Sequence, residues 1–522
     1  TAEFHIAPVT AQFLADRQYL AYIAFTRPSE FLCISFPCLD EKGGPIAHSH
    51  FIDDLKLLFD DLHEEFVGDN LLELDDVRNG AELTELLCTR LGRDAFLPAA
   101  CDKDRLRELL DAMQLAGDQE SIIRPVAAAL SYENHASLEP AVAKELFGRE
   151  IRGSATRLAA FATCPYKHFV RYTLGLKPRR EFKLDPLDLG LFYHSVLDSL
   201  QRRLSAERES FASVKEDRLV PLLDEQIAKL MEQDSFLSNF VQRSAHNAFV
   251  IYSAGEVLRD CVLAIAQMVR AGSFRPRLSE AAFGHAADAS SKFSRFELPL
   301  PDGRRLILSG KIDRLDVAEV TGRKAALILD YKRTQSGARF DWSSLYHGLD
   351  VQLAIYMLAV HHAGSAYADD IAGALYLPIE TPPQRAKPDE FDEGSRKFQR
   401  KARGIINGAY CGHLDAGAAG YSDYYGFYVK KDGDPYGQYS RSNALRPAHF
   451  TRLLEWSRKN IIRLAADIAS GRIECKPYHR GSERGCTFCE FLPVCHFDWQ
   501  INDYNFLSPI SKDDLIAKLE NR

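Results

Sequence analysis

The sequence contains no run of apolar residues long enough to cross a lipid bilayer. Its longest run of this kind, Val351 to Val360, is about half the length of a membrane-spanning helix, which needs roughly 20 residues. The first residues, TAEFHIAPVT, lack the layout of a secretory signal, and the chain does not begin with Met. We therefore expect a cytoplasmic protein without a membrane segment, and we interpret Thr1 as an internal cut in a longer chain.

Basic residues are not in excess, since 65 lysines and arginines stand against 73 aspartates and glutamates, a formal net charge of −8. This balance argues against a protein that coats nucleic acid by bulk charge attraction. Local basic surface is still compatible with DNA binding. We expect such a surface between Lys144 and Lys183, where basic residues outnumber acidic ones, although each of these side chains also fits a solvated helix face.

Cysteine is sparse, because 11 cysteines in 522 residues do not suggest a disulfide scaffold. The spacing of these cysteines therefore matters more than their number. The composition, 46% hydrophobic and 26% charged, is typical of a globular protein, and the length exceeds what one hydrophobic core usually supports. Two or more domains are expected.

The hydrophobic pattern predicts helices over most of the first half of the chain. Apolar residues recur three or four positions apart in FIDDLKLLFDDL and RLRELLDAMQLA, and Ser154 is placed to cap a helix that runs toward Cys164. A short buried strand, Glu30 to Phe36, is the predicted exception. The predicted helical stretches are residues 11–25, 51–147, 154–163, 187–203 and 204–271.

Strand-like sequence follows in four segments that are rich in β-branched and apolar residues. Turns are predicted at Asp302-Gly303 and Thr321-Gly322, and a helix from about Leu349 to His361 closes this block. The order predicts an α/β chain with a helix–sheet–helix core. The four segments are SEAAFG, SRFELPLP, RRLILSGKIDRLDV and KAALILDYKRT.

Two acids and a lysine on these strands indicate a hydrolytic metal site. Asp313 and Asp330 lie on neighbouring predicted strands, and Asp330 and Lys332, two residues apart, project from the same face. Carboxylates bind hard divalent cations such as Mg²⁺, and an ammonium stabilises the charge that develops in phosphodiester hydrolysis. A lone pattern of this kind is more often a surface hairpin, so its neighbours decide the interpretation.

Three further side chains are spaced to join this site. His194 follows Gly190 by four residues in GLFYHSVL, which places it on one helix face as a further metal ligand or as a core histidine. Gln352 and Tyr356 also share a helical face. They would orient a phosphate or the lysine, or they would simply pack an amphipathic helix.

Together these segments resemble the RecB-type nucleases of the PD-(D/E)XK superfamily. The resemblance rests on GLFYHSVLDSL, Glu280 in SEAAFG, GKIDRLDV, LILDYKR and QLAIY, in that order. It implies a mixed central sheet flanked by helices over residues 151–522 and cleavage that depends on Mg²⁺ or Mn²⁺. The implied metal ligands are His194, Asp313, Asp330 and the Tyr331 carbonyl, with Lys332, Gln352 and Tyr356 as further catalytic residues.

A second constellation consists of cysteines near the C-terminal end. Cys486, Cys489 and Cys495 form a C-x2-C-x5-C pattern, and Cys164 is the candidate fourth ligand. The spacing alone fits zinc, completed by His496 or a distant cysteine, as well as it fits an iron-sulphur cluster. The surrounding segments resemble those of AddB-type subunits, which implies a 4Fe-4S cluster. The other cysteines are interpreted as ordinary thiols: Cys33, Cys38, Cys88, Cys101, Cys261, Cys411 and Cys475.

The first part of the chain resembles the end of a helicase. ADRQYLAYIAFTRPSEFLCISF is similar to the last motif of superfamily I helicases, which implies that Arg27 contacts the terminal phosphate of a nucleotide. No G-x4-G-K-[ST] loop occurs in the sequence, so these residues cannot form an ATP site alone. We therefore expect a partial helicase-like, RecA-like region over residues 1–150, with a helical extension.

The resemblance implies an exonuclease that cuts single-stranded DNA as it leaves an ATP-dependent helicase, in the processing of double-strand breaks, with an AddA-type subunit as partner. One alternative is a free-standing iron-sulphur exonuclease of the CRISPR-adaptation type, although such nucleases are much smaller. The other is a DNA-binding scaffold that has lost cleavage. Retention of Asp313, Asp330, Lys332 and His194 disfavours this second alternative.

Overall fold

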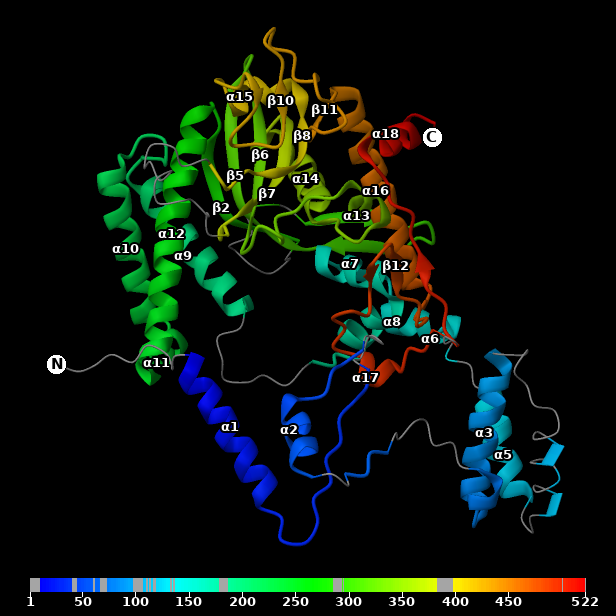
Figure 1. Cartoon of the computed structure of the whole chain (residues 1–522). Helices are drawn as coiled ribbons and strands as arrows, with labels where there is room; N and C mark the ends of the chain where they lie inside the picture. Colours follow the sequence, from blue (N-terminus) through cyan, green and yellow to red (C-terminus); the bar gives the residue numbers. More distant parts are fainter. Residues whose placement is uncertain are drawn as a thin grey trace. The chain divides into compact units, whose positions relative to one another are not determined.

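The computed structural model of the chain forms two compact units, Thr1–Tyr132 and Glu133–Arg522 (Figure 1). Among the described residues, no helix combines the length and the apolar composition needed to cross a bilayer. The structure describes residues 10–39, 45–59, 62–65, 73–96, 107–108, 111, 114–115, 119–131, 134, 137–177, 186–284, 293, 295–382, 398–499 and 501–521.

The regular elements formed by the described residues of the first unit are helices. Helices α3 and α5 pack through Leu86, Leu87 and Ile122, which supports the helical pattern predicted for this region. Part of the predicted helix RLRELLDAMQLA lies outside the described residues. The elements are α1 (Thr10–Thr26), α2 (His50–Leu58), the 3-10 turn η1 (Leu74–Asp76), α3 (Gly80–Phe96) and α5 (Gln119–Leu130).

The buried strand predicted over Glu30–Phe36 is wrong. These residues are unpaired, and the side chain of Phe31 is 81% exposed. The alternating apolar residues favour a strand, but a strand is stable only when a neighbouring strand accepts its backbone hydrogen bonds. No such neighbour occurs among the described residues of this unit.

The second unit is built on a mixed six-stranded sheet with the order β11-β8-β7-β6-β5-β2. Strand β6 runs parallel to β7 and antiparallel to β5, so the α/β fold with a mixed sheet is confirmed. The strands are β2 (Arg275–Phe283), β5 (Gly310–Val320), β6 (Arg323–Lys332), β7 (Asp370–Pro378), β8 (Arg403–Asn407) and β11 (Ala444–Leu445).

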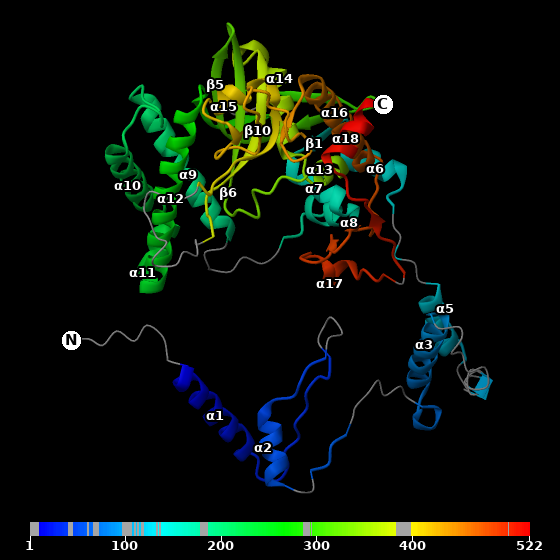
Figure 2. The same ribbon diagram turned by 45° about the horizontal axis from the view of Figure 1, so that its top comes forward.

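Helices cover both faces of this sheet, because alternate residues of its central strand enter two different cores. Ala326 and Ile328 of β6 pack with α14, whereas Leu327 and Leu329 pack with α9 and α12. Figures 1 and 2 show α9, α10 and α12 on one side of the unit and α7, α16 and α18 on the other. The long helices are α9 (Pro186–Ala206), α10 (Glu216–Gln233), α12 (Ala245–Ala271), α14 (Gln352–Ala363) and α16 (Pro447–Ala469).

The segment RRLILSGKIDRLDV forms two strands in place of the single predicted one. Its first part is β4 of a small sheet with the order β1-β4-β3, and its second part is β5 of the large sheet. The chain changes sheet at Ser309, whose N–H donates to the Gly153 carbonyl, and at Gly310, where an added Cβ would lie 2.6 Å from the Phe283 ring. The small sheet contains β1 (Glu150–Gly153), β3 (Phe296–Pro299) and β4 (Arg305–Leu308).

The C-terminal segment, residues 447–521, packs against the helices that begin the second unit. Ser154 caps α7 by accepting a hydrogen bond from the Arg157 N–H, as predicted, and α16 packs against α6, α7 and β1. A domain boundary near residue 150 is predicted from the sequence. In the structure α6 and β1 both belong to the second unit, which begins at Glu133. The elements of this region are α6 (Pro140–Phe147), α7 (Ala155–Thr163), α8 (Pro165–His168), η3 (Phe169–Thr173), β12 (Tyr478–Arg480), β13 (Glu483–Arg484), α17 (Leu492–Cys495), β14 (Asn505–Phe506) and α18 (Lys512–Glu520).

Short elements connect these parts of the second unit. They are α11 (Ser235–Arg243), α13 (Trp342–His347), η4 (Gly364–Ala366), η6 (Gly408–Tyr410), α15 (Cys411–Leu414), β9 (Gly420–Tyr421) and β10 (Tyr428–Val429).

One buried ion pair within the sheet gives a test of this packing. Arg314 Nε donates to Asp316 Oδ1 at 2.7 Å, and both side chains are almost fully buried. Replacing Asp316 with Ala would leave the guanidinium unpaired, so we expect a loss of about 3–5 kcal/mol in the free energy of unfolding, measured by chemical denaturation. The control, Glu297→Ala, removes a half-buried partner of Arg295 and of the exposed Arg305, and should cost no more than ~1 kcal/mol. Equal losses in both variants would contradict the assignment.

Candidate metal centre and cysteine cluster

Asp330 and Lys332 lie at the end of β6, where the amide of Gln352 from α14 joins them. Gln352 Nε2 donates to Asp330 Oδ1 at 2.7 Å, and Lys332 Nζ donates to Gln352 Oε1 at 2.7 Å. Lys332 Nζ also lies 2.8 Å from Asp330 Oδ2. Gln352 Nε2 reaches Tyr356 Oη at 2.9 Å. The structure thus brings together four of the side chains expected in the site.

A second group lies beside the first and comes from three different elements. His194 of α9, Glu280 of β2 and Asp313 of β5 each offer a ligand atom, and these atoms all lie within 4.8 Å of one another. His194 Nδ1 is 3.3 Å from Asp313 Oδ1 and 3.6 Å from Glu280 Oε1.

The backbone of Tyr331 joins the two groups. Its N–H donates to Asp313 Oδ2 at 2.7 Å, and its carbonyl accepts from His194 Nε2 at 3.1 Å. Its side chain points to the opposite face of the sheet, into the core with α9 and α12. The residue between Asp330 and Lys332 therefore aligns their strand with Asp313 and with the histidine.

Asp330 is buried in a way that favours a cation. Only 2% of this residue is exposed, and burial together with the charge of Asp313 raises the pKa of its carboxyl to about 7. Its Oδ2 atom faces Lys332 but accepts no hydrogen bond of normal geometry from the described residues. A buried carboxylate oxygen without a hydrogen bond has coordination capacity left for a metal ion.

His194 is held in its protonated form by the two carboxylates beside it. Its positive charge takes the role that a bound cation would have. Burial opposes a charged imidazole, but hydrogen bonds to Asp313 and Glu280 outweigh this effect and raise its pKa to about 10. Burial raises the pKa of the Glu280 carboxyl, but hydrogen bonds and charge interactions with His194 and Lys311 outweigh this effect and lower the pKa. Carboxylate, carbonyl and imidazole donors suit a divalent metal ion such as Mg²⁺ or Mn²⁺, so these residues fit the metal that the motifs imply.

Glu280 is the one member of this group to which the sequence analysis gives no role. It lies in a motif of the resemblance, but a single acid on a predicted strand carries no spacing signal. Its backbone has a φ of +47°, which is unusual for a residue other than glycine, and the β2–β5 register shifts nearby, between Pro276 and Leu278. The side chain forms an ion pair with Lys311 of β5.

The lysine is further supported by Asp350 and Tyr376, which the sequence analysis does not identify. Lys332 Nζ lies 4.8 Å from the centroid of the Tyr376 ring, and the Tyr376 hydroxyl donates to Asp350 at 2.7 Å. Asp350 Oδ1 also accepts from the Gln352 N–H at 3.2 Å. Asp350 therefore holds the Tyr376 ring and the backbone of Gln352, whose side chain contacts Lys332.

The four predicted cluster cysteines line one cavity, together with a fifth. Cys164 precedes α8, whereas Cys486, Cys489 and Cys495 come from the C-terminal segment. The additional thiol is Cys475, which the sequence analysis interprets as ordinary because it stands outside the C-x2-C-x5-C spacing. Thiolates are the ligands of iron-sulphur clusters and of structural zinc, so this donor set fits either group.

Two other predictions concern residues away from these sites. Arg27 lies in the first unit, exposed directly after α1, and its nucleotide contact stays a prediction. Of the remaining cysteines, Cys33 and Cys38 are exposed in the first unit, and Cys261 and Cys411 are buried in the core with α9 and α12. Cys101 lies outside the described residues.

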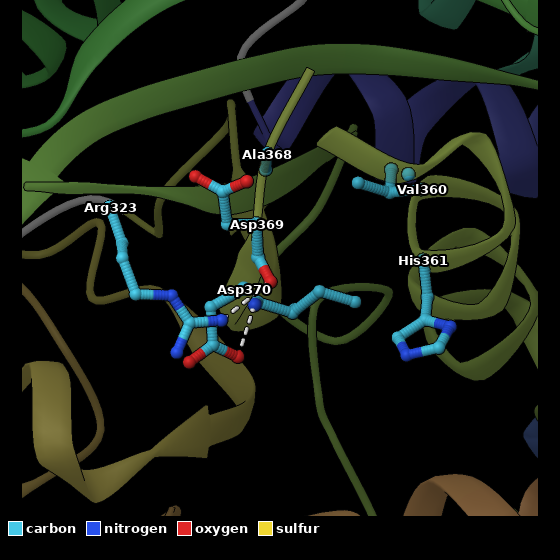
Figure 3. Close-up of a pocket in the computed structure, with 8 residues that line it drawn as sticks. Arg323, Val360, His361, Ala368, Asp369 and Asp370 are labelled. Atoms are coloured by element: carbon cyan, nitrogen blue, oxygen red, sulfur yellow. Dashed lines mark hydrogen bonds between the residues drawn. The ribbon is translucent and has the colours of Figure 1, made fainter. Parts of the chain in front are cut away.

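A larger cavity, of about 470 Å³, lies at the opposite end of β6 and β7 from Lys332. Figure 3 shows Arg323, Asp369 and Asp370 on one side of it and His361, from α14, on the other. Arg323 donates to the Asp369 carbonyl at 3.2 Å. None of the predicted site residues is among the described residues that line it.

Binding of a divalent cation should release protons, because the cation must replace the proton on His194 and any proton on Asp330. We therefore expect Mn²⁺ to bind more weakly as the pH falls below about 10, where His194 takes up a proton, and more steeply below about 7, where Asp330 does so as well. Calorimetry at neutral pH in buffers of different ionisation enthalpy measures the protons released. Asp313→Asn should abolish binding, whereas Asp369→Asn, at the other end of the sheet, should leave it unchanged. Binding without proton release would contradict this description.

Comparison with known proteins agrees with this geometry. Residues 152–496 match the PD-(D/E)XK nuclease superfamily. Three relatives are each named as the B-type subunit of an ATP-dependent helicase/deoxyribonuclease. The chain is 29% identical to the one from Moorella thermoacetica (96% of this chain, 43% of the relative), 30% to the one from Desulforudis audaxviator (98% and 44%) and 28% to the one from Bacillus cereus (97% and 44%). The chain thus spans less than half the length of these relatives. Because the superfamily match covers most of the chain and includes the residues around Asp330 and His194, the chain belongs to the PD-(D/E)XK nuclease superfamily.

Proposed function

We propose that the second unit is a metal-dependent deoxyribonuclease that hydrolyses phosphodiester bonds in single-stranded DNA. The observation that carries the proposal is the convergence of Asp330 and Lys332 with His194, Glu280 and Asp313 at one end of the sheet. Each of the elements involved, α9, β2, β5 and β6, contributes a charged side chain to a partly buried space. Burial of so many charged groups together costs stability in any protein. Such clusters are typical of catalytic sites, where the charges are needed for the reaction.

The proposed metal ligands are Glu280 and the residues that the sequence analysis identified. When bound there, a divalent cation polarises the phosphate and lowers the pKa of a water molecule. The residues that would hold it are His194, Glu280, Asp313, Asp330 and the Tyr331 carbonyl.

Lys332 is proposed to stabilise the negative charge that develops on the phosphate oxygens. Its ammonium is held by Gln352 and lies against the Tyr376 ring, so little reorganisation is needed when the substrate binds. Gln352 in turn is held by the Tyr356 hydroxyl. The side chain of Lys332 remains 28% exposed, which leaves it accessible to DNA.

The names of the relatives support a place in a larger complex. Each name describes one component of an ATP-dependent helicase/deoxyribonuclease, so we propose an AddA-type subunit as partner and unwound single-stranded DNA as substrate. An exonuclease of this kind would act in the processing of double-strand breaks. In this arrangement Arg27 would contact the nucleotide only together with a phosphate-binding loop, and no G-x4-G-K-[ST] loop occurs in this sequence.

A 4Fe-4S cluster is proposed to hold the two ends of the second unit together. Its ligands would be Cys164, Cys486, Cys489 and Cys495, and the first two are 322 positions apart (486 − 164). Closing so long a loop removes much of the conformational freedom of the unfolded chain. Zinc is the alternative occupant that the thiol donors allow.

Replacement of the lysine or the central acid tests the nuclease. Lys332→Ala and Asp330→Ala should each lower the cleavage rate of labelled single-stranded DNA with Mg²⁺ by about 10²–10³-fold. The first removes the ammonium that stabilises the reacting phosphate, and the second removes a proposed ligand of the metal ion. Lys324→Ala, an exposed lysine near the other end of β6, serves as the matched control and should cleave at the parent rate. If Asp330→Ala cleaves as fast as the parent chain, the site is misassigned.

Metal analysis tests the cluster. The protein purified without oxygen should be brown and contain iron and sulphide, and Cys489→Ala should lose both with its colour, because one of four ligands is gone. Cys33→Ala, an exposed thiol in the first unit, should retain them. A colourless parent protein that contains zinc would refute the iron-sulphur assignment.

A further inference from the structure

Five cysteine sulphurs line the cluster cavity, although a four-iron cluster takes four ligands. In this cavity the Cys475 thiol lies beside those of Cys164 and Cys495. It is 3% exposed, so it is a buried neighbour of the two ligand positions, not a surface thiol. Buried cysteines are common in protein cores, but this one lines a cavity together with four other thiols.

The backbone holds Cys475 in this place. The Tyr166 N–H donates to the Glu474 carbonyl at 3.1 Å, so the segment before Cys475 lies alongside the segment after Cys164. The Lys476 N–H also donates to the Glu474 carbonyl, at 2.9 Å, so the backbone on both sides of Cys475 bonds to the same oxygen. These backbone contacts hold Cys475 near Cys164.

Cys486 and Cys489 line the same cavity. Of the four proposed ligands, Cys164 and Cys495 are the two whose thiols lie beside Cys475.

We propose that Cys475 is a reserve ligand of the cluster, able to take the position of Cys164 or of Cys495. The inference rests on the proposed cluster. In the exchange, the bond from iron to the departing sulphur breaks and a bond from iron to the Cys475 sulphur forms. The proton of the Cys475 thiol passes to the departing thiolate, so charge is conserved and no electron is transferred. Exchange with Cys475 would keep four sulphurs on the cluster when Cys164 or Cys495 leaves it.

Alanine variants of the full chain test this proposal, because alanine cannot bind iron. Iron and sulphide content, absorbance near the cluster band and the electron paramagnetic resonance spectrum after reduction are measured for each variant. Cys164→Ala should retain the cluster with an altered spectrum, and Cys475→Ala should retain it unchanged. The double variant Cys164→Ala/Cys475→Ala should lose it. Cys489→Ala should lose it although Cys475 is present.

A second pair keeps the test decisive if one variant does not fold. Cys495→Ala should likewise retain the cluster, and Cys495→Ala/Cys475→Ala should lose it, with circular dichroism confirming the fold of each. If the parent has the cluster but folded Cys164→Ala and Cys495→Ala both lose it, the reserve ligand is refuted and the four-cysteine cluster stands. A parent without iron and sulphide contradicts the cluster itself, and the reserve ligand with it.

Discussion

The site depends on the burial of two carboxylates, Asp313 and Asp330, at the same end of two adjacent antiparallel strands. Two like charges in a poorly solvated place are unfavourable unless positive charge or donated hydrogen bonds compensate them. Three different parts of the fold supply this compensation: Lys332 from the same strand, the His194 imidazolium from α9 and the Gln352 amide from α14. The stability of the two buried carboxylates therefore depends on the positions of α9 and α14 on the sheet.

The same arrangement suits the site to a metal ion. A proton on His194 occupies the place of positive charge, held between Asp313 and Glu280. A divalent cation offers more charge to the same oxygens, so it would exchange with the proton instead of entering an already neutral site. Lys332, beside Asp330, is also held by Gln352 and lies against the Tyr376 ring. The proposed cluster lies elsewhere in the unit, where it joins α8 to the C-terminal segment.

Local patterns in the sequence predicted much of this fold and site. The two-residue spacing of Asp330 and Lys332 predicted a shared strand face, the four-residue spacing of Gln352 and Tyr356 predicted a shared helix face, and in the structure each pair is in contact. These predictions succeed because the geometry of a strand or helix fixes which neighbours meet. What failed depends on partners distant in sequence. Glu30–Phe36 has the pattern of a strand without a neighbour.

The residues that were missed have the same explanation. Glu280 reaches the site through an irregular backbone with positive φ, which no periodic pattern shows. Cys475 lies outside the cysteine spacing and joins the other four only because Glu474 pairs with Tyr166 across more than 300 residues. Asp350 and Tyr376 meet between a helix start and a strand, so neither element alone indicates the contact.

The most direct test of the central claim is a crystal of the protein soaked in Mn²⁺ and measured for anomalous scattering. The account predicts a peak among the side chains of His194, Glu280 and Asp313, within coordination distance of Asp330. A fully occupied Mn²⁺ elsewhere, with these four side chains still bound only to one another, would contradict it.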